Sequence, residues 1–394
     1  MADELPIAWA RAREIAYDRA RRSAAQDAAE VALAEADGLT LAEPLVARTP
    51  LPAFPTASVD GWVLRGDGPW RVTGRVLAGQ RPADLVTDGT AVEIATGAMV
   101  PTGSTSILRL EHGELAGDLL RGVPKDEPEW RVPGEESEAG EELLPAGTPI
   151  TPGVLGLAAS CGYDTLLARR APRATLLVFG DELLDAGLPG EGRVRDALGP
   201  SIPAALRRLG AHVDGFTRVP DTLEAHVDAI QRAAAGGNDL ICTTGGTMHG
   251  PVDYLHGALA QLDATYVVNT VAVRPGFPML VAQLPGGQFV AGLPGNPQSA
   301  MVALVSLVAP VLAGLTVRDL PALARVTLGA PVPGRGDFTH LALVRREQPG
   351  GPVYPVGHVG SAMLRGLAQS VGFAVVPPGV TGTDGDVVDL VELP

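Results

Sequence analysis

The chain contains little cysteine. Its 394 residues include only two, Cys161 and Cys242, which are too few for a disulfide framework or a cysteine zinc site. Both lie in apolar runs, as small core residues do. This usage fits a reducing compartment, and we expect a cytoplasmic protein.

Positive charge is scarce as well. Lys and Arg total 30 against 45 Asp and Glu, so the formal net charge is −15 and the pI is near 4.9. An acidic surface repels phosphate backbones and anionic membrane surfaces, which argues against a nucleic-acid-binding or membrane-binding protein. One small anionic ligand held by local backbone N–H groups stays compatible with this charge.

Long apolar segments and several familiar enzyme motifs are also missing. Residues 1–22 are charged and lack the apolar core of a signal peptide, and the apolar run 301–315 is short for a bilayer span and contains Pro310. We therefore expect a soluble protein. The histidines show no HExxH or HxxxH spacing and no GxSxG occurs, so a zinc hydrolase and an esterase are unsupported.

What the sequence does contain is a globular composition with many turns. Hydrophobic residues make up 46% and charged residues 19%, and the 49 glycines and 35 prolines follow no collagen period. The length suits about two to four domains.

The first half of the chain predicts helical and β-rich segments. Residues 5–35 have the apolar stripe of a helix, and prolines gather over 39–55. Short β-rich runs fill 56–145, with an acidic exposed loop over 126–142. Residues 150–170 predict a short helix followed by a strand.

In the second half, strands alternate with helices, which is typical of an α/β unit with a mainly parallel sheet. An apolar helix over 300–315 closes this unit, and strands and turns follow. The predicted fold is multi-domain α/β plus β, with central α/β/α layers, N-terminal helical and β segments and a small terminal β-barrel-like domain. The expected domains are 1–45 with 146–172 (helical and linker), 46–145 (β-rich), 173–318 (α/β) and 319–394 (terminal β).

A glycine turn, residues 243–253, follows a predicted strand of the α/β unit. Gly245 and Gly246 allow a tight turn that presents backbone N–H groups, and Thr247 adds a hydroxyl, which suits a phosphate or another oxyanion. The turn is neither GxGxxG nor a P-loop. A plain strand-to-helix turn is the alternative.

Carboxylates occur at turns of the same unit, where ligands of parallel sheets bind. Glu182 follows one strand, Asp196 lies in a later turn, and Asp253 ends the glycine turn. Such a set opposite a phosphate-binding turn suggests Mg²⁺, which takes oxygen ligands and bridges phosphates. Alternatively, Asp181 or Asp196 merely caps a helix.

Two proline-glycine turns complete the candidate cleft. Residues 292–300 open a predicted helix that Asn296 or Ser299 could cap, and helix N-termini favour anions. Arg274 places a cation at another strand end. A rigid turn is the alternative for each segment, but three such turns in one unit favour a common cleft.

Two further polar turns lie in the β-rich region. One carries Asp60 and the other begins at Thr96. Either could be only a loop, because sequence spacing gives no reason to place them in the cleft.

Together these segments resemble the molybdopterin molybdenumtransferase family, called MoeA-type in bacteria and the E domain in gephyrin-like proteins. Each motif is weak alone, but six in the family's order across nearly the whole chain are specific. In chain order they are Ser58–Gly61, Thr96–Gly103, Phe179–Leu183, Thr244–Asp253, Arg274–Pro278 and Leu293–Pro297.

The resemblance implies an elongated four-domain homodimer that inserts molybdate into adenylylated molybdopterin, with Mg²⁺-dependent release of AMP. It places the cleft between the α/β domain of one subunit and the Asp60 segment of the other. It also implies a molybdopterin adenylyltransferase and molybdoenzymes as partners. The catalytic and metal-binding residues would be Asp60, Glu182, Asp196 and Asp253, the phosphate turn Gly245, Gly246, Thr247 and Gly250, and the remaining substrate contacts Thr96, Arg274, Pro294, Asn296, Pro297, Ser299 and Ser361.

The sequence departs from the family pattern at the oxyanion end. Arg274 and Phe277 stand where the family has two lysines, and His340 stands where it has an arginine. A lost ammonium removes charge-assisted hydrogen bonds worth about 1.5–3 kcal/mol each. Besides the transferase, two hypotheses stay open: a divergent relative that binds molybdopterin or a partner protein without turnover, and an unrelated α/β enzyme for another phosphorylated ligand.

Overall fold

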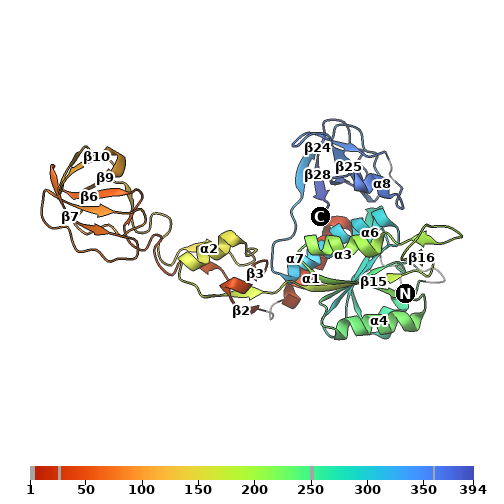
Figure 1. The fold of residues 1–394 in the computed structure, drawn as a ribbon. Coiled ribbons are helices and arrows are strands. Elements are labelled where there is room, and N and C mark those ends of the chain that lie inside the picture. Colours follow the sequence, from red (N-terminus) through yellow and green to blue (C-terminus); the bar gives the residue numbers. More distant parts are fainter. Residues whose placement is uncertain (1–4, 25–27, 249–252, 358–359) are drawn as a thin grey trace. The chain divides into compact units, whose positions relative to one another are not determined.

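The computed structural model describes residues 5–24, 28–248, 253–357 and 360–394. The chain forms two compact units (Figure 1), and chain crossings near residues 30, 38, 43 and 167 connect them. The larger unit comprises residues 1–29, 38–42 and 167–394, and the smaller unit comprises residues 30–37 and 43–166.

The smaller unit contains a six-stranded sheet in the order β10-β11-β7-β8-β6-β9. Successive residues of β6 point to opposite faces: Trp62 and Leu64 belong to one buried apolar cluster and Val63 to another. This sheet confirms the predicted β-rich region. Its strands are β6 (Gly61–Arg65), β7 (Trp70–Val76), β8 (Thr90–Ile94), β9 (Ser106–Arg109), β10 (Gly113–Ala116) and β11 (Leu119–Gly122).

Short elements make up the rest of this part of the chain. Helix α2 (Pro152–Ser160) begins with the Thr151 hydroxyl accepting a hydrogen bond from the N–H of Val154, and β14 (Thr165–Arg169) follows it, as predicted. The other strands are β2 (Ala28–Ala32), β3 (Thr40–Leu41), β4 (Leu45–Val46), β5 (Thr56–Ala57), β12 (Trp130–Arg131) and β13 (Glu142–Leu144), with 3₁₀ turns η2 (Leu33–Glu35) and η3 (Leu110–His112).

The helix expected over residues 5–35 is shorter than the sequence suggested. Helix α1 spans Trp9–Ser23, and the prediction is wrong for Ala28–Ala32, which forms β2. This segment is rich in alanine and so has high helix propensity, but β2 pairs with β14 in a three-stranded sheet. Tertiary pairing outweighs the weak intrinsic preference.

The α/β part of the larger unit has a six-stranded sheet in the order β18-β15-β19-β23-β22-β20. The pairs β15–β18, β15–β19 and β19–β23 are parallel, and β22 is antiparallel to both of its neighbours. The sheet is therefore mainly parallel, as expected. Its strands are β15 (Arg173–Phe179), β18 (His212–Val219), β19 (Leu240–Thr244), β20 (Thr265–Val268), β22 (Leu280–Gln283) and β23 (Phe289–Leu293).

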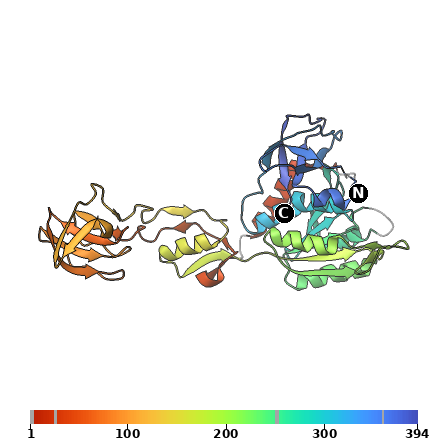
Figure 2. The same ribbon diagram turned by 45° about the horizontal axis from the view of Figure 1, so that its top comes forward.

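Helices cover both faces of this sheet (Figures 1 and 2). In β15, Leu176 and Val178 face one apolar cluster, whereas Leu177 and Phe179 face the other. The first cluster includes α1, α3 (Leu198–Arg208) and the helical run α6 (Pro297–Ala303), η4 (Leu304–Val308) and α7 (Ala309–Leu315), and the second includes α4 (Leu223–Ala235) and α5 (Leu255–Gln261). These layers confirm the α/β/α prediction.

The run Pro297–Leu315 is a core helix. Among the described residues it is the one helix whose length and composition would suit a membrane crossing, but 94% of its apolar window is buried inside the structure. The indole N–H of Trp9 in α1 donates to the Ser306 hydroxyl at 2.8 Å.

The terminal sheet has the order β1-β21-β25-β27-β28-β24, with β26 paired to β25. Strands β1 and β21 come from earlier parts of the chain, and β21 runs parallel to β25 with Arg274 opposite His340. The sequence did not indicate that these strands join the terminal β domain. The elements are β1 (Ile7–Ala8), β21 (Val271–Arg274), β24 (Ala324–Thr327), β25 (Thr339–Arg346), β26 (Val353–Pro355), β27 (Gly372–Val376), β28 (Val387–Glu392) and α8 (Leu364–Ala368).

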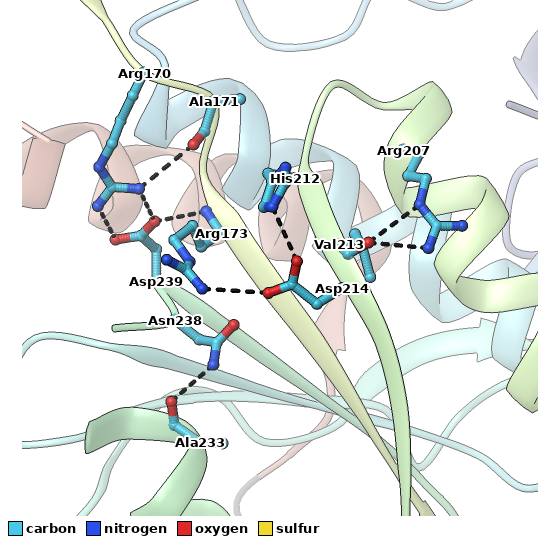
Figure 3. Close-up of polar contacts among 10 residues, drawn as sticks. All are labelled: Arg170, Ala171, Arg173, Arg207, His212, Val213, Asp214, Ala233, Asn238 and Asp239. Atoms are coloured by element: carbon cyan, nitrogen blue, oxygen red, sulfur yellow. Dashed lines mark hydrogen bonds and ion pairs between the residues drawn. The ribbon is translucent and has the colours of Figure 1, made fainter. Parts of the chain in front are cut away.

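An ion-pair cluster holds the N-terminal ends of the central strands together (Figure 3). The Arg170 guanidinium forms two bonds, of 2.6 and 2.8 Å, to the Asp239 carboxylate, which also accepts the N–H of Arg173 at 2.7 Å. Arg173 in turn contacts Asp214 at 3.2 Å. These groups lie at the edge where the parallel strands begin, so the carboxyl edge is left for a ligand.

Candidate functional site

A cavity of about 1550 Å³ lies in the larger unit, lined by residues of the α/β part and of the terminal sheet. The predicted residues that line it are Glu182, Asp196, Gly245, Gly246, Thr247, Asp253, Arg274, Pro294, Asn296, Pro297, Ser299 and Ser361. Asp60 and Thr96 belong to the smaller unit, and Gly250 lies outside the described residues.

The glycine turn follows the fully buried strand β19 at the cavity. Gly245 has φ +86° and Gly246 φ +69°, a backbone region that residues with a β-carbon rarely adopt. The N–H of Gly245 donates to the Leu293 carbonyl at 2.9 Å, and a β-carbon on Gly295 would lie 3.8 Å from Gly245 Cα. The glycine turn and the Leu293–Pro297 turn are therefore neighbours.

Asp196 fits the capping alternative. Its Oδ1 accepts hydrogen bonds from the N–H groups of Leu198 and Gly199, both at 2.9 Å, at the start of α3. Its buried Oδ2 has no hydrogen-bond partner among the described residues and lies 3.7 Å from a guanidinium nitrogen of Arg218. The carboxylate thus anchors α3 and keeps one oxygen without a donor.

The other two carboxylates of the cavity are more accessible. Glu182 is exposed and Asp253 is half-buried. Within the described part of the chain, no three or more His, Cys, Asp or Glu side chains form a group that could hold a metal ion.

The Arg274 side chain lies against two aromatic rings. Its Cζ is 5.2 Å from the ring centre of Phe277 and 4.6 Å from that of Phe338. The two rings meet edge to face, with centres 5.8 Å apart. Both distances are within the range of cation–π contacts, and all three residues line the cavity.

His340 lies on β25 opposite Arg274 and is buried. Its Nδ1 contacts the Pro333 carbonyl at 2.7 Å, so Nδ1 carries the proton that it donates. Burial lowers the pKa of His340 below the usual 6.5, and the Arg335 charge lowers it further, although the Pro333 bond opposes the shift. At pH 7 the ring is therefore mainly neutral and adds little charge to the cavity.

Four further residues of the cavity were missed in the sequence. Gln298 follows Pro297 within a recognised turn, and its buried Oε1 has no hydrogen-bond partner among the described residues. Its backbone N–H donates to the Ser361 carbonyl at 2.9 Å, which joins the α6 turn to the terminal domain. Arg195 is adjacent to Asp196, and this position next to a predicted site residue could have indicated it. Arg335 and Phe338 lie in no motif, so only the fold reveals them.

In the smaller unit, Asp60 and Thr96 contact each other. One carboxylate oxygen of Asp60 accepts from the Thr96 backbone N–H at 2.7 Å and from its hydroxyl at 2.9 Å. These two bonds lower the pKa of Asp60 below its usual value. The carboxylate is therefore ionised and held in one orientation on its loop.

Comparisons with known proteins agree with the motif order. Three family models match successive regions: the MoeA N-terminal region (domain I and II) over 7–162, a probable molybdopterin binding domain over 175–314, and the MoeA C-terminal region (domain IV) over 325–393. A molybdopterin molybdenumtransferase of Staphylococcus aureus is 28% identical over 379 residues, covering 92% of this chain and 90% of the relative.

A relative of the same name from Staphylococcus epidermidis is 28% identical over 378 residues and covers 91% of this chain and 90% of its own length. A crystal structure of a molybdopterin biosynthesis MoeA protein from Pyrococcus horikoshii has the same fold. Its TM-score is 0.78 at 19% identity, and it covers 98% of this chain and 100% of its own. The chain belongs to the MoeA family.

Proposed function

We propose that the protein is a molybdopterin molybdenumtransferase, which inserts molybdate into adenylylated molybdopterin and releases AMP in a Mg²⁺-dependent reaction. The observation that carries this proposal is that a glycine turn, accessible carboxylates and an arginine line the same cavity. A polyanionic substrate with a phosphoanhydride needs these three kinds of group. The 28% identity of the named transferases over 92% of the chain supports the same reaction.

The glycine turn is the proposed phosphate end of the site. Gly246 and Thr247 offer backbone N–H groups, and Thr247 a hydroxyl, beside the cavity, and consecutive backbone N–H groups bind anions well. The N–H of Gly245 is used in the bond to the Leu293 carbonyl, so Gly245 shapes the turn. The role of Gly250 stays a prediction. Pro294, Asn296, Pro297 and Ser299 form the neighbouring turn, where we place the pterin or molybdate end together with Ser361.

Glu182 and Asp253 fit a Mg²⁺ ion held jointly with the substrate. Mg²⁺ is commonly bound by one or two protein carboxylates together with phosphate oxygens and water, and both side chains line the cavity. Bound there, the ion would offset the charge of the pyrophosphate group during its cleavage. Asp196, with one oxygen used for α3, contributes negative charge and fixes the turn.

The homodimer is part of the proposal. In it, the hydrogen-bonded Asp60–Thr96 pair of one subunit completes the cavity of the other. The proposal includes the four domain boundaries given above, a cytoplasmic location, and contacts with the adenylyltransferase that supplies the substrate and the molybdoenzymes that receive the product. Its support is the family membership of the whole chain.

The test is AMP release from adenylylated molybdopterin by the purified protein with Mg²⁺, measured with and without molybdate. Release that requires both molybdate and Mg²⁺ is the expected result. Tight pterin binding without release under any of these conditions would contradict the transferase, as would release that is independent of molybdate.

A further inference from the structure

Arg274 is a cation of the cavity whose guanidinium lies against two aromatic rings. Among the ion pairs of the described residues, none joins a carboxylate to its guanidinium, and the side chain is exposed and lines the cavity. Its charge is therefore available to a ligand, while the contacts with Phe277 and Phe338 limit where the guanidinium can lie.

Two segments of the backbone position the two rings beside Arg274. Phe277 is on the turn that directly follows β21, and Phe338 immediately precedes β25, the strand paired with β21. Gly276 allows the turn: its φ is +99°, and a β-carbon there would lie 3.0 Å from Met279 Cε. The aromatic rings thus come from the segments that flank two paired strands, one after β21 and one before β25.

Stacking suits an arginine better than a lysine. The planar guanidinium can lie against a ring while its N–H groups point outward as donors in a fixed fork. The chain contains one lysine, Lys125, in the smaller unit, and 29 arginines. The larger unit therefore has no lysine side chain. A tetrahedral oxyanion in the cavity would instead meet the N–H groups of a guanidinium that is already oriented by the rings.

We propose that Phe277 and Phe338 are positioning residues that hold the Arg274 guanidinium as the oxyanion-binding group of the cavity. The site then depends on the orientation of one stacked guanidinium and not on the total positive charge of its wall. The identification of the oxyanion as molybdate rests on the proposed function.

This inference separates orientation from charge at position 277. In the variant Phe277→Lys, a ring is lost and an ammonium is placed about as close to Arg274 as the ring is now. If charge were limiting, this variant would use molybdate better than the unaltered protein. Under the proposal it uses molybdate worse, because the like charge repels Arg274 and one side of its support is gone.

The experiment measures the apparent KM for molybdate and kcat in AMP release. Phe277→Leu and Phe338→Leu should each raise the KM by about two-fold to thirty-fold, the range of a lost cation–π contact from an exposed to a desolvated site. Phe338→Tyr keeps an aromatic ring at this position, so its KM should be close to that of the unaltered protein. Phe338→Leu should have a much smaller effect in an Arg274→Lys background, because a lysine gains less from the ring.

Tyr354→Leu is the matched control. It removes the ring of another arginine–aromatic pair of the terminal sheet, in which Arg345 Cζ lies 5.8 Å from the ring centre, and Tyr354 does not line the cavity. Its KM should stay unchanged. Thermal unfolding of each variant shows whether a changed KM comes from a damaged fold.

Two results would overturn the inference: an unchanged KM in both leucine variants, or a lower KM in Phe277→Lys. If the unaltered protein released no AMP, the proposed function would fail, and tungstate titration by calorimetry would decide the inference alone. A tungstate affinity that is weaker in Phe277→Leu and Phe338→Leu than in the unaltered protein would support the inference. Ring-independent affinity, or no binding at all, would refute it.

Discussion

At the scale of single residues, the cavity combines groups that the sequence had separated into different motifs. Asp253 and Glu182 offer carboxylates, whereas the neutral His340 offers none of the charge that its position suggested. Other buried polar groups of this unit affect stability. Asp196 accepts two hydrogen bonds at the start of α3, whereas the His226 ring nitrogens have no hydrogen-bond partner among the described residues. Residue-level predictions therefore have to separate chemistry from stability.

Asp253→Asn tests the chemical role of a cavity carboxylate. The substitution keeps the size of the side chain and removes its charge, so we expect AMP release to slow by about a hundred-fold or more, as for the loss of a metal ligand worth several kcal/mol. Steady-state kinetics at saturating Mg²⁺ checks this. Asp228→Asn, on the outer helix α4, is the control and should behave like the unaltered protein, whereas normal release by Asp253→Asn would remove Asp253 from the mechanism.

His226 is a second residue-scale test, of stability and its pH dependence. The ring is fully buried, stacks on Phe179 with ring centres 3.7 Å apart, and neither nitrogen has a hydrogen-bond partner among the described residues. Burial lowers the pKa of His226 below 6.5, although nearby Asp221 opposes the shift. The unfolded chain then binds more protons than the folded protein as the pH falls below 6.5, so the protein loses stability there.

We expect His226→Phe to keep the stacking on Phe179. Its free energy of unfolding at pH 7 should equal that of the unaltered protein or exceed it by as much as about 3 kcal/mol. The loss of stability between pH 7 and pH 5 should become smaller. Urea unfolding across this pH range measures both effects. His212→Phe, at an exposed position, is the control and should retain the pH dependence of the unaltered protein. A pH dependence that stays unchanged in His226→Phe would show that His226 does not cause the loss of stability.

At the scale of elements, the strand–turn–helix order positions each group at the cavity. Strand β19 ends in the glycine turn, β23 ends in the turn that opens the run Pro297–Leu315, and β21 ends at Arg274. These three strands belong to two different sheets. The cavity thus depends on both sheets, and a change in the anchoring of one element affects the whole site.

Asp196 tests the link between a helix start and the site. Asp196→Ala removes the acceptor of two N–H groups of α3 and should cost about 1 kcal/mol of unfolding free energy. Asp196→Asn retains an oxygen acceptor and should unfold like the unaltered protein in urea. If Asp196→Asn nevertheless slows AMP release, its charge acts in the reaction. If its release is normal, the residue serves α3 only.

At the scale of the whole molecule, the two compact units should unfold separately. Trp9 lies in the larger unit and Trp62, Trp70 and Trp130 lie in the smaller one. Tryptophan fluorescence therefore follows mainly the smaller unit, and far-UV circular dichroism follows both. We expect the two denaturation curves to differ in midpoint, with Trp9→Phe making fluorescence specific for the smaller unit. Coincident curves in that variant would show that the units unfold together.

The proposed shared site makes a second prediction at this scale. Asp60→Ala and Asp253→Asn should each be inactive, but random mixed dimers should recover about a quarter of the activity, since half the dimers are mixed and one of their two sites is intact. Co-expression with two affinity tags and AMP release of the purified mixture measures this. Recovery of no activity in verified mixed dimers would contradict a site shared between subunits.

The sequence alone determined the local features of the protein. Contiguous residues encode the alternating strands and helices, the glycine turn at 243–253 and the family motifs. This is because the hydrophobic period and the turn-forming residues act over a few positions of the chain. For the same reason it indicated the α/β/α layers and the family correctly.

Tertiary structure decided what depends on distant partners. It turned Ala28–Ala32 into a strand and brought β21 into the terminal sheet, where Phe338 meets Arg274 across 64 positions of the chain. It also used Asp196 to start α3. Such contacts arise from strand pairing and packing between segments far apart in sequence, which no local pattern encodes.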